Sequence, residues 1–279
     1  MMYIDTRLRP PYGSFVEGFY NKEKWAIREN FAEQFGMKLS PSFYEASMDL
    51  CIAEMEEAGI GLGIAAPRRG WGIGNEDIPQ LLKDYPGKFI GFATLIPTDI
   101  ETALQEIQEY VIDGPCTGIY MEPAHDTAKE KMTIDDERMY PIYQKCEENK
   151  IPISYGYGGF IGTDFIWQKP EGLLQVVKDF PNLHLNLNHA GFPYVLQTLH
   201  IAYRNRNLFL SPDLYSFHAP GCQDYIEAAN RLLTNSITFG SAYPLVDFRM
   251  GVKIYEEKIR AEVLDKIMCG NAKRFLGME

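Results

Sequence analysis

The sequence predicts an α/β chain that folds as a single-domain (β/α)8 barrel, the TIM-barrel architecture. Eight short, apolar, β-rich segments alternate with stretches of helical spacing, a pattern typical of βα units with parallel strands. The chain has 279 residues, and such a barrel typically needs about 250. A doubly wound open sheet is the alternative. That fold would want a glycine-rich phosphate loop after the first strand, where this chain has Pro10 and Pro11.

The predicted strands are short runs rich in β-branched, aromatic and other apolar residues. They cover residues 3–8, 60–66, 89–95, 118–122, 151–155, 183–188, 207–211 and 236–241. Helical spacing predicts helices over residues 42–58, 75–85, 103–112, 136–149, 170–180, 192–203, 222–233, 245–258 and 261–275. Capping signals support two helix ends, since Asp99 precedes the third helix and Gly277 follows the last.

The first connection, residues 10–40, is unusually long and rich in aromatic residues. Long βα loops in barrels usually serve a function, so we expect a cap segment there. Neither a linker nor a low-complexity tract interrupts the chain, and we therefore predict one domain over residues 1–279.

The composition of the chain limits the kinds of partner that it is expected to bind. The chain is 46% hydrophobic and carries a net charge of −11, which argues against nucleic acid and anionic membrane surfaces. It has no apolar run of about 20 residues and no secretion signal at its N-terminus. Its five cysteines are dispersed without a CxxC pair, as in reduced cytosolic proteins. We expect a cytoplasmic protein, and self-association into a homo-oligomer is left open.

Barrel enzymes place their chemistry at the C-terminal ends of the strands. The first strand ends in Arg7 and Arg9, which strand alternation would put on one face with Asp5. Two guanidinium groups invite a carboxylate. The alternative is an internal ion pair with Asp5, Glu122 or Asp213. Substrate binding is favoured because burying arginines without an anion is costly.

Other strand ends offer groups for proton transfer. His189 follows the sixth strand and is the candidate general acid or base, because its reference pKa lies near neutrality. Glu122 and Asp213 are candidates for proton transfer or water activation. A structural hydrogen bond for His189 and salt bridges for the carboxylates are the alternatives. Four tyrosines lie near strand ends, namely Tyr155, Tyr157, Tyr215 and Tyr243. Most of them are expected to pack in the core, and one or two could donate a hydrogen bond to a developing oxyanion.

These strand ends also carry a family resemblance. Asp-Thr-Arg-Leu-Arg at residues 5–9 resembles the Asp-x-His-x-His opening of the amidohydrolase superfamily. Residues 188–193, 239–244 and 271–276 are similar to its motifs after strand 6, after strand 8 and near the C-terminus. The match is to the amidohydrolase-2 branch, which includes aminocarboxymuconate semialdehyde decarboxylase and related lactonases and hydratases. The resemblance implies a (β/α)8 barrel with its site at the C-terminal face.

The departures from that family concern the metal. Its four metal-ligand positions correspond here to Arg7, Arg9, Gly156 and Ala242, and only His189 is retained. Arginine stays protonated and has no lone pair to offer a metal. We therefore expect no metal and no other cofactor. The alternative is one divalent metal at a site rebuilt from Glu122, His189 and Asp213.

The resulting hypothesis is a metal-independent, amidohydrolase-like hydrolase that acts on a small carboxylate-bearing lactone, ester or amide. Arg7 and Arg9 would hold the carboxylate or polarise the carbonyl, and His189 with Glu122 or Asp213 would activate water. A decarboxylase or hydratase of the same family is the first alternative, because a fold does not fix a reaction. The second is a non-catalytic barrel that binds an anionic metabolite or scaffolds a partner.

Overall fold

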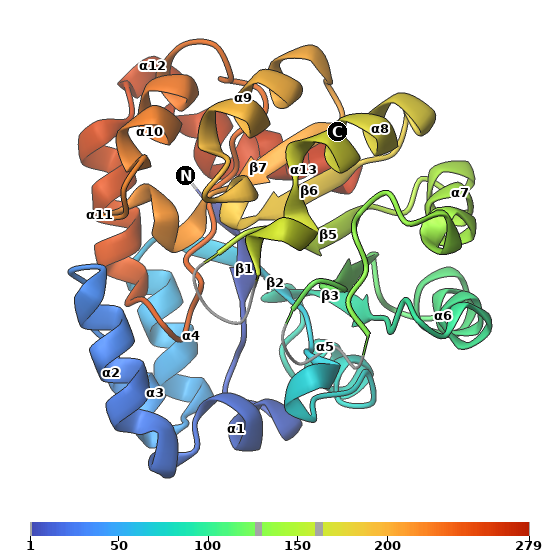
Figure 1. The fold of residues 1–279 in the computed structure, drawn as a ribbon. Coiled ribbons are helices and arrows are strands. Elements are labelled where there is room, and N and C mark those ends of the chain that lie inside the picture. The colour runs from blue at the N-terminus through green and yellow to red at the C-terminus, as the bar shows by residue number, and fades with distance from the viewer. Residues whose placement is uncertain (1, 126–129, 160–163, 279) are drawn as a thin grey trace.

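The computed structural model describes residues 2–125, 130–159 and 164–278. Parallel strands in sequential order form the wall of a barrel, with helices around it (Figure 1). The strands are β1 (Tyr3–Leu8), β2 (Ile60–Ala65), β3 (Phe89–Thr94), β4 (Gly118–Met121), β5 (Ile153–Gly156), β6 (Leu185–Asn188) and β7 (Leu208–Ser211). The predicted fold class and the first seven predicted strands are confirmed.

The eighth predicted strand, residues 236–241, does not form a regular strand. The segment still closes the barrel, because isolated parallel bridges join Ile237 to Leu210 in β7 and Tyr243 to Leu8 in β1. The Thr6 backbone N–H also donates to the Phe239 carbonyl at 3.0 Å. Ala242 has a left-handed φ of 60°, which interrupts an extended backbone. The eighth position is therefore filled by an irregular segment.

Most helices fall in the predicted intervals, but the first two lie in the first connection, where no helix was predicted. The α-helices are α1 (Ser14–Phe19), α2 (Trp25–Gln34), α3 (Pro41–Glu45), α4 (Met48–Glu57), α5 (Ile78–Asp84), α6 (Ile100–Glu106), α7 (Tyr140–Glu148), α8 (Pro170–Asp179), α9 (Val195–Arg204), α10 (Cys222–Asn230), α11 (Phe248–Lys258), α12 (Ala261–Asp265) and α13 (Asn271–Leu276). Short 3-10 or π turns are η1 (Lys22–Lys24), η2 (Arg69–Trp71), η3 (Ile107–Ile112), η4 (Glu137–Met139), η5 (Phe165–Gln168), η6 (His189–Gly191), η7 (Asp213–Ser216) and η8 (Lys266–Gly270).

The first predicted helix is divided into two α-helices. The segment 42–58 was expected to be continuous, but α3 ends at Glu45 and the next residue, Ala46, adopts a left-handed φ of 47°. A new helix then starts at Ser47, whose side chain accepts a hydrogen bond from the Leu50 N–H as an N-cap. Serine at this position offers the backbone a helix start, which apolar spacing alone does not reveal.

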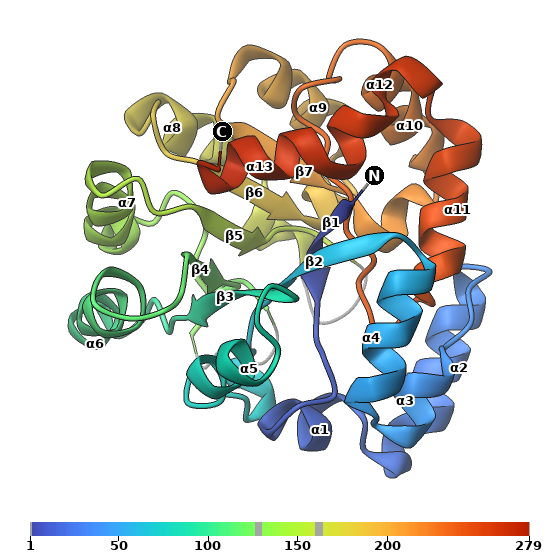
Figure 2. The same ribbon diagram turned by 180° about the vertical axis from the view of Figure 1, so that it is seen from behind.

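The N-terminal end of the barrel is closed by the chain's last helix. In Figure 2, α13 crosses this end. Its Phe275 ring lies 6.0 Å from Phe92 and 5.7 Å from Phe209, measured between centroids. His184, just before β6, contacts the Phe275 carbonyl oxygen through Nδ1 at 3.0 Å. Because these aromatic contacts close the N-terminal end of the barrel, the C-terminal end is the one available for a functional site.

The long first connection packs beside the C-terminal end of β2. Its Phe19 ring stacks on Trp71 of η2 with centroids 4.8 Å apart. A Cβ on Gly18 would lie 2.5 Å from Cδ1 of Ile73, so α1 approaches this turn as closely as a glycine permits. Over the ranges that the structure covers, every helix is too short or too polar to cross a membrane.

Candidate active site

A small cavity of about 210 Å³ lies at the C-terminal ends of the strands. Most pockets for drug-sized ligands measure about 300–1,000 Å³, so this one suits a small molecule. Its charged lining among the described residues is cationic, from Arg7, Lys24, Arg28 and Arg68, and two histidines join them, His125 and His189. Apolar walls come mainly from Ile27, Phe31, Trp71, Leu214 and Leu245. The cavity is thus a positively charged spot on an acidic protein.

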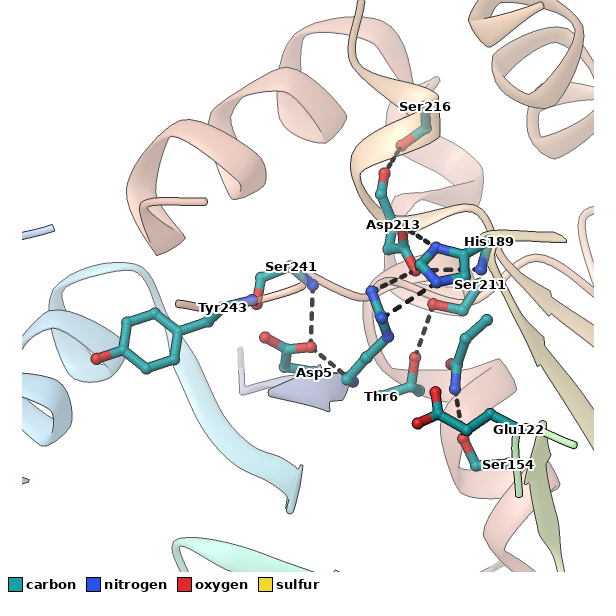
Figure 3. Close-up of polar contacts among 12 residues, drawn as sticks. Asp5, Thr6, Glu122, Ser154, His189, Ser211, Asp213, Ser216, Ser241 and Tyr243 are labelled. Carbon is teal, nitrogen blue, oxygen red and sulfur yellow. Dashed lines mark hydrogen bonds and ion pairs between the residues drawn. The ribbon is translucent and has the colours of Figure 1, made fainter. Parts of the chain in front are cut away.

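An irregularity in β1 aims Arg7 into this cavity. Asp5 pairs with Gly63 and Leu8 with Ala65, so β1 has one residue more than β2 between these pairs, which is a β-bulge. The Asp5 carboxylate turns to the backbone instead, where Oδ1 accepts from the N–H groups of Arg7 at 2.9 Å and Ser241 at 3.0 Å (Figure 3). The expected common face of Asp5, Arg7 and Arg9 is therefore not formed.

Arg7, His189 and Asp213 form a closed triangle of contacts. Arg7 Nη1 donates to Asp213 Oδ2 at 3.0 Å, and Arg7 Nη2 lies 3.2 Å from His189 Nε2. His189 Nδ1 lies 3.3 Å from Asp213 Oδ1, and the His189 backbone N–H donates to Oδ2 at 3.1 Å (Figure 3). Both His189 and Asp213 adopt left-handed φ, 66° and 44°. Strained backbone of this kind clusters at functional sites.

Burial and the neighbouring charges determine the protonation states of His189 and Asp213. Burial lowers the pKa of His189, and the positive charge of Arg7 acts in the same direction against the attraction of Asp213. Burial would raise the pKa of Asp213, but the charges of His189 and Arg7 outweigh it and the pKa is lowered. At neutral pH we therefore assign an ionised Asp213 and a neutral imidazole. The contacts favour Nδ1–H donating to Asp213, with Nε2 accepting from Arg7.

Glu122 is bound by Arg68 and Tyr120, away from the contacts of His189. It accepts two hydrogen bonds of 2.6 Å from Arg68 and one of 2.8 Å from the Tyr120 hydroxyl. Although burial opposes ionisation, the Arg68 charge lowers the pKa of Glu122 to about 2. Among the described residues Glu122 makes no hydrogen bond to His189, so the structure does not bring these two candidates together. Of the two predicted carboxylates, Asp213 is the one beside His189.

Arg9 also differs from expectation, because it is not among the described residues that line the cavity. It is 3% exposed, and its guanidinium carbon lies 5.0 Å from the centroid of Phe19. Within the part of the chain that the structure describes, its side chain makes no hydrogen bond. Burial and the neighbouring Arg7 lower its pKa to about 9, which still leaves it charged at neutral pH.

Three of the four candidate tyrosines serve packing. Tyr155 and Tyr157 are buried in contact with each other, and the Tyr157 hydroxyl donates to the Lys169 carbonyl. Tyr243 is stacked on Phe248 and bonded to the Ser42 hydroxyl. Tyr215 alone among the four lines the cavity, with its ring 5.2 Å from that of His189.

Four residues that line the cavity had no role assigned to them from the sequence: Lys24, Arg28, Arg68 and Trp71. Arg68 lies three residues after β2 and was recognised as a strand-end residue, but its charge was not assigned to the site. Lys24 ends η1 and Arg28 lies four residues later in α2, both in the segment expected to be a cap, and Trp71 lies in η2. No sequence pattern links these segments, because only the fold brings the first connection against the end of β2.

The described residues do not assemble the metal centre implied by the family. None of them form a cluster of three His, Cys, Asp or Glu side chains that could hold a metal ion. Asp213 and His189 contact the Arg7 guanidinium, and Glu122 is engaged by Arg68, so the rebuilt site is not formed either. A Cβ at Gly156 would lie 2.9 Å from the Glu122 Cβ, so a histidine there would need Glu122 to move.

The buried Asp5 predicts a pH-dependent stability. Burial raises its pKa to about 6 from an ordinary 3.8, so the folded state favours the protonated form. This contribution to stability is present below about pH 4 and is lost as the pH rises through about 6. Asp5→Asn keeps an acceptor for both N–H groups but cannot ionise. We expect its stability relative to wild type to improve by on the order of 2–3 kcal/mol between pH 4 and pH 8.

Urea unfolding of both proteins across this pH range is the measurement. A difference between them that stays constant from pH 4 to pH 8 would show that Asp5 does not titrate in this window.

Fold and site together define a (β/α)8-barrel protein with a cationic cavity at its C-terminal face. The family model described as Amidohydrolase matches residues 4–278. The chain therefore belongs to the amidohydrolase family, and the resemblance to the amidohydrolase-2 branch is confirmed.

Individual relatives agree with this assignment. An uncharacterized TIM-barrel protein from Bordetella bronchiseptica is 34% identical, with 99% of each chain covered and a TM-score of 0.92. A 2,6-dihydroxybenzoate decarboxylase from Rhizobium shares the fold at a TM-score of 0.74 and 14% identity, over 100% of this chain and 99% of that one. A 2-amino-3-carboxymuconate-6-semialdehyde decarboxylase from Dictyostelium discoideum is 23% identical over 244 residues, 74% of this chain but only 66% of its own length.

Proposed function

We propose that this protein is a metal-independent carboxy-lyase, which removes CO2 from a small acid bearing a phenolic or enolic hydroxyl β to the carboxylate. The observation that carries the proposal is the Arg7, His189 and Asp213 triangle, which opens onto a small cavity whose described charged lining is cationic. The two named relatives that are decarboxylases support this reaction over the hydrolysis that the sequence favoured. The arginines that stand at the ligand positions support independence from metal.

Decarboxylation needs a place for the electron pair left by CO2 and a proton for the carbon. The substrate oxygen takes the place of His189 Nε2 as partner of Arg7, which frees Nε2 to accept the proton of the substrate hydroxyl. The resulting imidazolium is stabilised by Asp213 and passes this proton to the carboxylate-bearing carbon, which gives a β-keto acid. The C–C bond then breaks, CO2 leaves, and the electron pair moves onto the oxygen beside the Arg7 guanidinium.

The remaining step restores the starting state. Water protonates the product oxygen, so one carboxylate and one proton become one C–H bond and one CO2. His189 ends as it began, neutral and bonded to Asp213. The apolar walls around Phe31 and Leu214 disfavour a carboxylate and favour neutral CO2, which would assist the cleavage.

Hydrolysis of a lactone, ester or amide is the second candidate. A neutral imidazole beside a buried aspartate is also the arrangement that activates water, and Arg7 would then polarise the carbonyl. The two reactions share their residues and differ in their products. A non-catalytic barrel is disfavoured, because such a barrel need not hold an acid–base pair and an arginine in convergent contact.

The test uses the full-length protein after its metal content has been measured and chelator has been added. It is incubated in D2O with a panel of ortho-hydroxybenzoic acids and carboxylated lactones. We expect CO2 release and one deuterium at the former carboxylate position, unchanged by chelator. Ring opening of a lactone without CO2 would establish the hydrolase instead, and activity that requires added zinc or manganese would disprove metal independence.

A further inference from the structure

We propose that the cavity contains a second anion subsite, formed by Lys24, Arg28 and Arg68 around Trp71, and that the substrate is therefore a dicarboxylate. The inference rests on the proposed function for the end of the molecule that reacts at His189. It adds a non-reacting carboxylate at the cap-side wall, bound by residues to which the sequence assigned no role.

The three cations gather on one indole ring. The guanidinium carbons of Arg68 and Arg28 lie 4.7 Å and 4.9 Å from the Trp71 centroid, and Nζ of Lys24 lies 6.0 Å from it. Cation–π attraction holds each of them there. Three like charges this close together repel one another, and a bound anion would relieve that repulsion.

Carboxylate partners do not balance this cluster. Arg68 is paired with Glu122, and Arg7 with Asp213, so these two pairs are close to neutral. Among the described residues, neither Lys24 nor Arg28 contacts a carboxylate. Two positive charges at the cavity are therefore left without an acidic partner.

Among the three cations, Arg28 provides the strongest argument for a bound anion. It is 6% exposed, and its single hydrogen bond within the described chain runs from Nη2 to the Gly18 carbonyl at 3.1 Å. Its buried Nε finds no hydrogen-bond partner among the described residues. Burial and the neighbouring Arg68 lower its pKa to about 10, so it remains charged at neutral pH. A buried, charged and under-bonded guanidinium at a cavity wall is suited to a planar carboxylate.

Size and placement fit a one-ring ligand. Arg28 and Lys24 belong to α2 and η1, whereas Arg7 and His189 come from β1 and the end of β6. All four line the same 210 Å³ cavity. A ring with one substituent at His189 and a carboxylate on another carbon can then reach both groups.

The test compares benzoate with isophthalate, which has one more carboxylate on the same ring, by isothermal titration calorimetry. We expect isophthalate to bind about tenfold more tightly, the effect of one net hydrogen-bonded charge pair. Lys24→Gln should weaken isophthalate about threefold to tenfold and leave benzoate unchanged. Lys24 is exposed, so this variant should fold. Lys22→Gln is the matched control, because Lys22 contacts Trp25 and does not line the cavity.

Arg28→Gln should remove most of the preference for isophthalate. Equal affinities for the two ligands in wild type, with benzoate binding weakened by Arg7→Lys, would overturn the second subsite and leave the proposed function standing. If neither ligand binds, the carboxylate-binding cavity and the subsite are both wrong. Loss of isophthalate binding in Lys22→Gln equal to that in Lys24→Gln would also contradict the assignment.

Discussion

His189→Asn is expected to reduce kcat/KM for decarboxylation by about 10²–10⁴-fold, the usual contribution of a general acid–base group. Asparagine cannot accept the substrate proton and return it to carbon. The fold should survive, because the His189 backbone N–H and Arg7 would still bind the buried Asp213. The rate of CO2 release and the midpoint of thermal unfolding are the two measurements. Activity should collapse while the midpoint stays close to that of wild type.

The pH dependence identifies the group that is lost. Because burial lowers the pKa of His189 below its ordinary 6.5, the neutral base form persists to lower pH. The acid limb of kcat/KM should therefore lie below pH 6.5 in wild type and disappear from the residual activity of the variant. His200→Asn, at an exposed position on α9, is the matched control and should leave the rate unchanged. A His189→Asn protein that retains full activity would remove this residue from the mechanism.

The barrel was predictable because its signals are local and repeated. Seven strands were recognised from short β-rich runs such as residues 89–95, and each lies within two residues of its predicted ends. The eighth segment was predicted at residues 236–241, but as a regular strand rather than the irregular segment that the structure shows. The left-handed backbone conformation of Ala242 depends on its contact with β1, where its N–H donates to the Arg7 carbonyl. This contact joins opposite ends of the chain. Strand propensity carries no information about that contact.

The site was predictable only in part, for a similar reason. Arg7 lies near the end of β1, and His189 and Asp213 follow β6 and β7. The barrel brings these strand ends together whatever the details. The β1 bulge instead turns the side chains of Asp5 and Arg7 toward different partners, and a one-residue insertion in the pairing leaves no mark in a single sequence. Glu122 was expected near His189, but Arg68 competes for it with two hydrogen bonds. Pairings among several buried charges depend on distances that only the folded chain defines.

The buried Arg7 and Asp213 pair should dominate the stability of the site. Asp213 is fully buried and Arg7 is 6% exposed. Asp213→Leu should reduce the free energy of unfolding by about 3–5 kcal/mol, because it leaves the guanidinium buried without its anion. Arg7→Met should cost less, since Asp213 keeps its hydrogen bonds from His189. The double variant should be more stable than the sum of the two single losses predicts, with a coupling energy of about 1–3 kcal/mol.

Urea unfolding of all four proteins gives the cycle, with the slope m checked for constancy. The exposed pair of Lys253 and Glu257, whose charged atoms are 3.7 Å apart on α11, is the matched control. Its cycle should give no more than about 0.5 kcal/mol. If the buried pair also yields so little, water must reach the Arg7 guanidinium once Asp213 is gone. Its charge would then be solvated rather than trapped, and the free arginine would be able to bind a substrate anion without the aspartate. That result would move the role of Asp213 from holding Arg7 to orienting His189, which a comparison of kcat in Asp213→Leu and Arg7→Met would then measure directly.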